Sequence, residues 1–293
     1  MTPNPNQFFD AVSKTERLSP APRILGRAIS LLKDPESNID DIAVLINSDP
    51  ALVADMIRGA NSVMYGGTER VSSLERALQK IGFGESVRLL NLAVTRIFAT
   101  RNLENYGMAA DDFWAESLFS GLFLKGLATT TGAFEPDEAH TAGLLRFIGR
   151  LAIEQCLKDV GGGTRWDGMA QLETWEIAQT GFSNPQASAA LLRNWKFPEN
   201  LIQALQWQNQ PASAPATNWL ADALHFSSAV LPQGLGLSFA VLASNYEVQT
   251  LPETDFVRQH AMTVERITKL VDDCRREFIA IASKLYDYRK ATG

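Results

Sequence analysis

The sequence is poor in the residues that most often bind metals or act as acid–base groups. It holds only three histidines, His140, His225 and His260, and two cysteines, Cys156 and Cys274. No histidine belongs to an HxxxH motif or stands beside an aspartate, and the chain has no CxxC motif. A zinc site built from thiolates is therefore excluded. We interpret the lone histidines as structural residues and both cysteines as small buried thiols.

Long apolar runs and excess basic charge are also missing. No apolar run reaches the roughly 18 residues that a membrane span needs. The opening segment, MTPNPNQFFDAVSK, has neither the charged nor the apolar region of a signal peptide. The net charge is −6, whereas phosphate contacts to nucleic acid need a basic surface. We therefore expect a cytoplasmic protein with no membrane contact, and we do not expect nucleic acid as a partner.

Glycine and serine occur without the contexts that make them catalytic. The run VGGGT, 160–164, lacks the lysine of a phosphate-binding loop and does not follow a strand. No serine lies in a GxSxG motif. Short motifs therefore give no support for catalysis, and we expect no cofactor.

What the sequence does contain is helical periodicity almost throughout, with no strand-like alternation. Asp49 and Pro50 predict a helix start, as N-cap and first helical residue. Ser72 and Glu75 are spaced as a capping box, and Gly82 predicts the end of that helix. The predicted helices cover 38–49, 50–60, 74–81, 85–100, 112–130, 136–158, 168–180, 185–195, 198–208, 219–231, 238–246 and 253–289, the last as a pair or one bent helix. The fold class that this pattern predicts is all-α.

The segment TAGLLRFIGRLAI, 141–153, poses the main question of the sequence. It is nearly apolar, but Arg146 and Arg150 interrupt it, together with Gly143 and Gly149. A charged side chain in a helix built for burial needs either a partner or a route to solvent.

The segment INSDPALVADMIRGANSVMYGG, 46–67, resembles the signature of HDOD domains, a bacterial signalling branch of the HD phosphohydrolase superfamily. The matching features are Asp49-Pro50, Leu52, Ala60-Asn61-Ser62 and Tyr65-Gly66. The flanking segments LSPAPRILGRAISLL and VSSLERALQKIGFGESVRLL extend the resemblance from about residue 18 to about residue 230. The resemblance implies an HD-domain/PDEase-like helical fold. It also implies an N-terminal helical subdomain at 1–105, an HD-like subdomain at 106–232 and a C-terminal helical extension at 233–293.

The resemblance also implies where metal ligands would lie. HD hydrolases bind divalent metal ions through histidines and aspartates, including an adjacent His-Asp pair. The matching positions here hold, in chain order, Glu116, Arg146, Phe147, Asn184, Gln208, Asn209 and Ser228. Arginine cannot bind a metal and Phe147 has no donor atom. The resemblance therefore implies a pseudo-enzyme with a vestigial pocket.

Two interpretations explain how the charge of Arg146 is accommodated in this apolar segment. In the first, Arg146 and Glu116 form an ion pair that fills the vacated metal site, because a hydrogen-bonded pair tolerates burial better than a lone charge. In the second, Arg146 extends to solvent with its stem over Ala142 and Gly143. We favour the ion pair.

Three functions follow from this reading. The first is a non-catalytic signal-transduction and regulatory module that binds other signalling proteins. The second is a metal-dependent phosphohydrolase whose unrecognised ligands come from Asp111, Asp112, Asp137, Glu138 and His140. The third is a sensor that holds a nucleotide in the degenerate pocket through Arg146, Asn184, Gln208 and Asn209. We favour the first.

Overall fold

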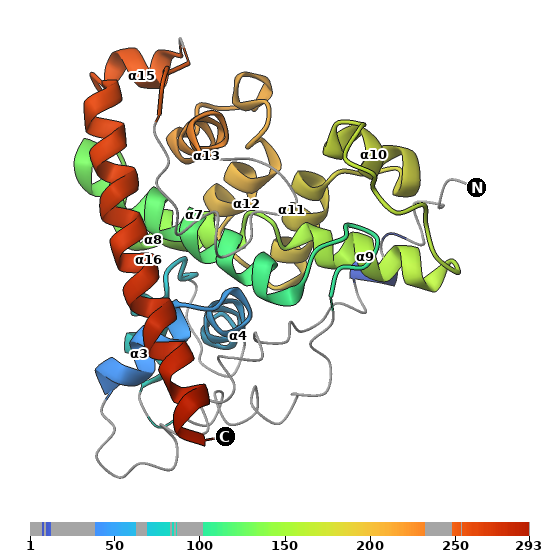
Figure 1. Ribbon diagram of the computed structural model, residues 1–293, viewed down its shortest axis with the longest axis horizontal. Helices are drawn as coiled ribbons and strands as arrows, with labels where there is room; N and C mark the ends of the chain where they lie inside the picture. The colour runs from blue at the N-terminus through green and yellow to red at the C-terminus, as the bar shows by residue number, and fades with distance from the viewer. Residues whose placement is uncertain are drawn as a thin grey trace.

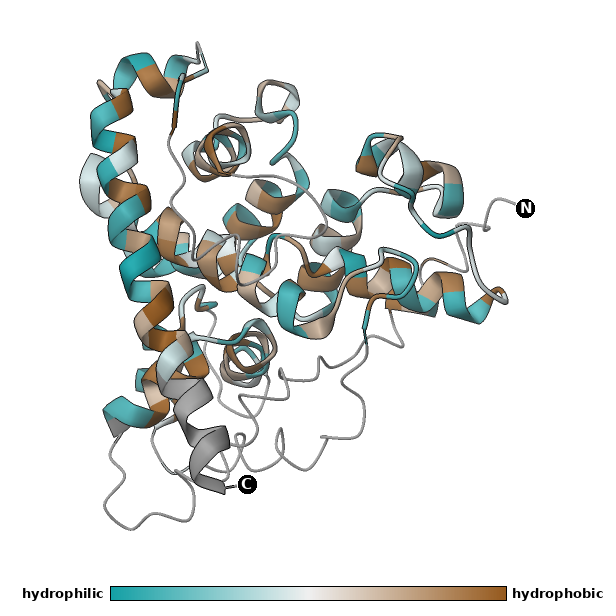
Figure 2. Cartoon of the chain, viewed as in Figure 1, coloured by the Kyte–Doolittle hydropathy of each residue, from teal (hydrophilic) through white to brown (hydrophobic). Residues whose placement is uncertain are grey.

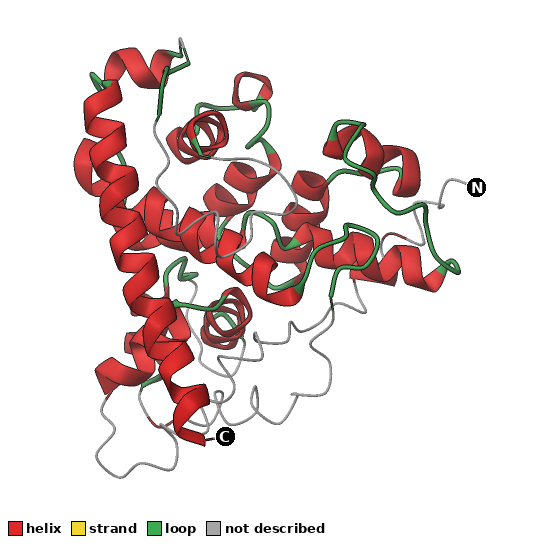
Figure 3. Cartoon of the chain, viewed as in Figure 1, coloured by secondary structure: helices red, strands yellow, loops and turns green. Residues whose placement is uncertain are grey.

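The computed structural model describes residues 8, 10–12, 39–62, 69–82, 84, 86, 102–231, 248–252 and 254–292, and its helices are shown in Figure 1. They are α3 Ile39–Asn47, α4 Pro50–Ala60, α5 Leu74–Ile81, α7 Ala110–Thr131, α8 Pro136–Leu145, α9 Gly149–Asp159, α10 Leu172–Thr180, α11 Asn184–Asn194, α12 Glu199–Gln206, the 3-10 helix η3 Pro211–Ser213, α13 Trp219–Val230, α15 Asp255–Gln259 and α16 Val264–Thr292. The described residues form no β-strand, only one isolated bridge between Leu103 and Met108 (Figure 3). The all-α prediction is confirmed. The predicted helix 238–246 and almost all of the predicted helix 85–100 lie outside the described residues.

The caps of α4 follow the sequence prediction. Asp49 is the N-cap, and its side chain accepts hydrogen bonds from the backbone N–H groups of Ala51 and Leu52 at 2.9 and 3.0 Å. Asn61 closes the helix. Its side-chain amide donates to the carbonyl of Val71 and accepts from the N–H of Val71, each at 2.9 Å. Asn61 therefore ends one helix and also fixes the chain that leads into α5.

The start of α5 corrects the prediction by one residue. The N-cap is Ser73, whose hydroxyl accepts from the N–H of Arg76, and the predicted capping box at Ser72 and Glu75 is wrong. Two adjacent serines can both offer a capping oxygen, and spacing alone did not distinguish them. The predicted end at Gly82 is confirmed, with a φ of 79° that favours glycine.

Two side chains from the centre of the molecule hold the turn between α3 and α4. The indole of Trp114, on α7, donates to the carbonyl of Ser48 at 2.8 Å. The Nε2 atom of His140, on α8, lies 2.9 Å from the carbonyl oxygen of Asn47. His140 is buried, and its role here is structural, as expected for a lone histidine. These contacts join the N-terminal helices to the central pair.

The helices α7 and α8 form that central pair and pack against each other more extensively than any other two described helices. Gly143 allows the close approach, since a Cβ atom there would lie 2.5 Å from the carbonyl oxygen of Ser120. Leu118 on α7 and Leu144 and Leu145 on α8 are fully buried. Apolar residues face inward on most of the surrounding helices (Figure 2).

The predicted helix 136–158 is interrupted at the residues that matter most. The structure has two helices, α8 and α9, joined by a turn of Arg146, Phe147 and Ile148. The N–H of Gly149 leaves the helical pattern and donates to the hydroxyl of Ser188 on α11 at 2.9 Å. A Cβ atom on Gly149 would lie 2.3 Å from the carbonyl oxygen of Asn184. The turn therefore lets the beginning of α11 approach the backbone.

The C-terminal region forms the predicted helix pair, α15 and α16. The long helix α16 runs along one side of the molecule and packs on α7 (Figure 1). Its fully buried Phe278 contacts the rings of Trp114 and Phe119. Cys156 and Cys274 are buried thiols, as predicted. None of the described helices is long and apolar enough to cross a membrane.

Candidate functional site

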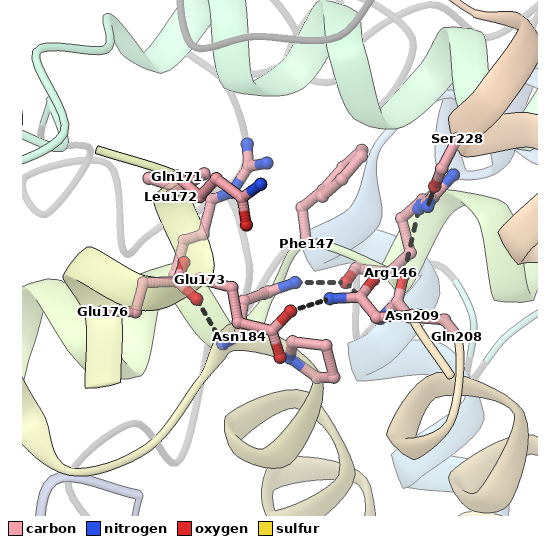
Figure 4. Close-up of a pocket in the computed structure, with 12 residues that line it drawn as sticks. Arg146, Phe147, Gln171, Leu172, Glu173, Glu176, Asn184, Gln208, Asn209 and Ser228 are labelled. Atoms are coloured by element: carbon pink, nitrogen blue, oxygen red, sulfur yellow. Dashed lines mark hydrogen bonds between the residues drawn. The ribbon is translucent and has the colours of Figure 1, made fainter. Parts of the chain in front are cut away.

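A pocket of about 300 Å³ lies at the turn between α8 and α9 (Figure 4). Its walls also include α10, the first residues of α11, the segment after α12, and α13. The structure brings six of the seven residues singled out from the sequence to this pocket: Arg146, Phe147, Asn184, Gln208, Asn209 and Ser228. The seventh, Glu116, is buried on α7 and reaches the site through a partner that lines the pocket.

Arg146 points from the turn toward the segment after α12 and toward α13. Its Nε donates to Oε1 of Gln208 at 3.1 Å and its Nη1 to the hydroxyl of Ser227 at 2.6 Å. Its Nη2 donates to the hydroxyl of Ser228 (Figure 4). The residue is only 4% exposed, so the alternative in which Arg146 extends to solvent is wrong.

The backbone of Arg146 is fixed as firmly as its side chain. Because the helix breaks here, its carbonyl is free to accept from the side-chain amides of Asn184 at 3.0 Å and Gln208 at 3.2 Å. Two amides that replace predicted metal ligands therefore hold the turn itself.

The predicted ion pair between Arg146 and Glu116 is wrong, because the cation that pairs with Glu116 is Arg150. Nη1 of Arg150 donates to Oε2 of Glu116 at 2.6 Å, and both side chains are more than 90% buried. In a continuous helix Arg146 and Arg150 would share one face, four residues apart. The turn separates them, so that Arg150 reaches α7 while Arg146 reaches α13.

Phe147 lies against both guanidinium groups. Its ring centroid is 4.8 Å from the guanidinium carbon of Arg146 and 4.3 Å from that of Arg150. Cations over a ring face are stabilised by the negative charge of the π system. Burial, more than any other cause, lowers the pKa of Arg146 to about 10, so the side chain is still charged at neutral pH.

The opposite wall carries two carboxyl groups that the sequence reading missed. Glu176 is 1% exposed and accepts from the hydroxyl of Tyr106 at 3.1 Å and from the N–H of Asn184 at 2.7 Å. Burial raises the pKa of Glu176 to about 7. Glu173 accepts from the side-chain amide of Asn209 at 2.8 Å. Both glutamates lie in an ordinary-looking helix, α10, whose sequence gives no sign that it faces a pocket.

These residues do not fit the divalent metal ions that the family resemblance implies. Two guanidinium groups cannot ligate a metal, and they repel a cation. Glu116, the carboxylate at a matching position, is already neutralised by Arg150. Among the described residues, no group of three or more His, Cys, Asp or Glu side chains could hold a metal ion.

The five residues that the sequence analysis considered as unrecognised metal ligands lie away from this pocket. Asp137 pairs with Lys125 at 3.0 Å, His140 contacts the carbonyl of Asn47, and Glu138 accepts from the side chain of Asn200. Asp111 and Asp112 lie in the first turn of α7. None of the five lines the pocket at the α8–α9 turn.

Comparison with known proteins places the fold. A family model described as HDOD domain matches residues 18–211. The MmoQ response regulator from Methylococcus capsulatus str. Bath is 23% identical, with a TM-score of 0.65 over 87% of this chain and 98% of that chain. A virulence factor from Campylobacter jejuni subsp. jejuni is 18% identical, with a TM-score of 0.66 over 92% of this chain and 99% of that chain. At these identities the two structures establish a shared fold.

A curated relative is considerably longer than this chain. An uncharacterized protein from Treponema pallidum (strain Nichols) is 22% identical over 213 residues, which are 70% of this chain and 40% of that protein. The chain therefore spans less than half the length of this curated relative.

Proposed function

Because the chain belongs to the HDOD domain family, we propose that it is a non-catalytic signalling module that regulates other proteins by binding them. The observation that carries this proposal is the position of Arg146. It stands where the resemblance implies a metal-binding histidine, it is buried, and Gln208, after α12, and Ser227, on α13, hold its guanidinium in place.

The chemistry of the pocket supports this reading. Hydrolysis of a phosphoester in the HD superfamily depends on a metal ion that activates water. Here Arg146 and Arg150 make the corresponding region positive, and Phe147 offers no donor. Glu176 has a pKa near neutrality, which suits a general base. Its two oxygens, however, already accept hydrogen bonds from Tyr106 and Asn184, which favours a structural role.

The signalling part of the proposal draws on the family. HDOD domains resemble the HD hydrolases in fold, and one solved relative of this chain is described as a response regulator. That description belongs to the relative. For this chain we propose regulation through protein binding at the face that carries the degenerate pocket.

Metal loading and hydrolysis test the loss of catalysis. The protein is purified without chelator or affinity-tag metal, incubated with Mn²⁺ or Fe²⁺, desalted and analysed by mass spectrometry for metal per chain. We expect metal far below one ion per chain, and background hydrolysis of bis(p-nitrophenyl) phosphate. Near-stoichiometric metal together with hydrolysis that EDTA abolishes would overturn the proposal.

Protein binding has its own test. The chain is cross-linked at native abundance in the cells that encode it, and cross-linked peptides are identified by mass spectrometry. A photo-reactive amino acid at Ile177, an exposed residue of α10, provides the cross-linking group, and we expect reproducible cross-links from it to a defined signalling protein. Cross-links to no protein above the level seen with an unrelated bait would argue against the regulatory role.

A further inference from the structure

Arg146 is a buried cation whose partners are all neutral. Within the described part of the chain, its guanidinium bonds to the amide of Gln208 and to the hydroxyls of Ser227 and Ser228, and no carboxylate lies within ion-pair distance. The two hydroxyls each donate to the carbonyl of Leu224, so they meet Arg146 with lone pairs. A buried charge without a counter-charge is unfavourable. Arg146 therefore makes no hydrogen bond to a counter-charge, and Glu116, whose charge acts on Arg146 from a distance, is already paired with Arg150.

Arg150 supplies a second cation with an unused donor. Its Nη1 is taken by Glu116, but its Nε atom is buried and has no hydrogen-bond partner among the described residues. The residue is 6% exposed and lines the pocket. The Arg150 guanidinium therefore has unmet hydrogen-bonding capacity beside the pocket.

The two arginines line one pocket and contact one ring. Both guanidinium carbons lie within 5 Å of the Phe147 ring centroid. An anion with more than one charge and oxygens pointing in several directions suits two guanidinium groups better than a flat carboxylate does. Phosphate has this chemistry.

The rest of the pocket defines what would be attached to the phosphate. Glu173 and Asn209 also line the pocket, where a carboxylate and an amide oxygen can accept from hydroxyl groups (Figure 4). The same carboxylate would repel a second phosphate. A volume of about 300 Å³ is at the small end of ligand pockets. The occupant is therefore small, with one anionic end and one hydroxylated end.

We propose that the pocket binds a small hydroxylated phosphomonoester, with its phosphate group against Arg146 and Arg150 and its hydroxyls toward Glu173, and releases it unchanged. This inference rests on the proposed function in one respect, because a ligand that is held without cleavage needs a non-catalytic site. It adds a small-molecule input to a module that otherwise acts only through proteins.

Isothermal titration calorimetry of the full chain tests the binding. The probes are inorganic phosphate, ribose 5-phosphate and adenosine 5′-monophosphate, with ribose and chloride as controls at constant ionic strength. We expect saturable binding of the two phosphomonoesters, weaker binding of inorganic phosphate, and no binding of ribose. Absence of saturable binding for all three phosphate compounds would overturn the inference.

Variants locate the site. Arg146→Met removes the cation and keeps most of the volume, and we expect at least about a tenfold weaker affinity because a charge-assisted hydrogen bond is lost. Arg146→Lys retains charge and keeps the inference testable where the methionine variant fails to fold. Arg193→Met, on the exposed face of α11, is the matched control and leaves affinity unchanged. Unchanged affinity in both folded Arg146 variants would place the ligand elsewhere and contradict the inference.

Phosphorus NMR of the same samples distinguishes failure of the proposed non-catalytic function from failure of the proposed ligand binding. We expect each phosphomonoester to remain intact during prolonged incubation with Mn²⁺ present. Release of inorganic phosphate would contradict the non-catalytic function and the claim that the ligand leaves unchanged, whereas the position of the binding site would still be supported by the titrations. Intact ligand with no binding would contradict the inference and leave the proposed function untouched.

Discussion

Arg150 and Glu116 form a buried ion pair, 2.6 Å between Nη1 and Oε2, that joins α9 to α7. Both side chains are less than a tenth exposed, so water screens the pair very little. Glu116 occupies a position where the family resemblance implies a metal-binding histidine. The guanidinium of Arg150 therefore compensates the charge of this carboxylate.

Breaking this pair from one side destabilises the fold. Glu116→Gln leaves the Arg150 guanidinium buried without its counter-charge, and removing one partner of a buried pair costs about 3–5 kcal/mol. Urea unfolding at pH 7 measures the change in the free energy of unfolding. The exposed pair between Asp255 and Arg258 is the control, since Asp255→Asn removes a surface interaction worth about 0.5 kcal/mol.

Removing both charges together recovers most of the loss. In the double variant Glu116→Leu/Arg150→Met the two apolar side chains pack where the ions were, and such replacements are often neutral. We expect it to be more stable than Glu116→Gln in the same urea experiment. A double variant less stable than the single one would mean that the pair stabilises the fold through more than charge compensation.

The turn at 146–148 depends on Gly149. An added Cβ atom would lie 2.3 Å from the carbonyl oxygen of Asn184, and backbone must shift to relieve that overlap. We expect Gly149→Ala to lower the free energy of unfolding by about 1–3 kcal/mol, as overpacking does. Thermal unfolding followed by circular dichroism measures the shift.

Gly84→Ala is the matched control for that experiment. Gly84 is exposed, helical and has open space around its Cβ position. Alanine there gains up to about 1 kcal/mol of helix propensity. A loss of stability in Gly84→Ala equal to that in Gly149→Ala would remove the steric explanation.

The sequence predicted features that depend on neighbours along the chain. Asp49 caps α4 because its side chain bonds to residues two and three positions later, and Gly82 ends α5 through its own positive φ. Such signals are local, and a single sequence carries them. Six residues of the vestigial pocket also come together, because the resemblance transferred a three-dimensional arrangement that local patterns do not contain.

Features set by tertiary contacts were not predictable in this way. The helical pattern of 136–158 continues past Arg146, yet the structure has a turn at 146–148, where α11 contacts Gly149, and Arg146 points away from Glu116. Glu176 stands between Trp175 and Ile177 in a short helix, and only the fold shows which of these side chains points inward. The direction of a turn and the inward face of a short helix depend on packing partners far away in the sequence.

The substitution Asn61→Asp tests one residue of the family signature. Its amide both donates to and accepts from the backbone of Val71. Aspartate has the same shape but cannot donate when ionised, so Asn61→Asp loses one bond and leaves the Val71 carbonyl facing a negative charge. We expect a loss of about 1–3 kcal/mol in urea unfolding at pH 7.

Asn102→Asp is the control for charge alone. Asn102 is exposed and uses only its side-chain oxygen, which accepts from the N–H of Ala110 at the start of α7. Aspartate keeps that bond and suits a helix N-terminus, so its effect stays within about 0.5 kcal/mol. Equal losses in Asn61→Asp and Asn102→Asp would show that the added charge, and not the lost donor, is responsible.

Glu176 makes the stability of the protein depend on pH. Burial raises its pKa in the folded state to about 7, from an ordinary value of 4.5. Between these values the folded chain keeps a proton that the unfolded chain has lost. The stabilisation is therefore complete below pH 4.5 and is lost as the pH rises through about 7, by up to about 3 kcal/mol.

Glu176→Gln removes that dependence. A neutral amide can accept from the N–H of Asn184 and donate to the hydroxyl oxygen of Tyr106, so both hydrogen bonds of the carboxyl survive in the variant. We expect the variant to be more stable than the wild type at pH 8 and to differ little from it at pH 5. Urea unfolding at pH 5, 6, 7 and 8 gives the stability of both proteins as a function of pH.

Two other charged groups lie around Glu176, namely Arg150 and Glu173. Both are present in the variant and in the wild type, so their own pH dependence cancels in the comparison. Parallel profiles across this range would show that Glu176 is already ionised in the folded protein at pH 5. Its hydrogen bonds to Tyr106 and Asn184 would then outweigh the effect of burial.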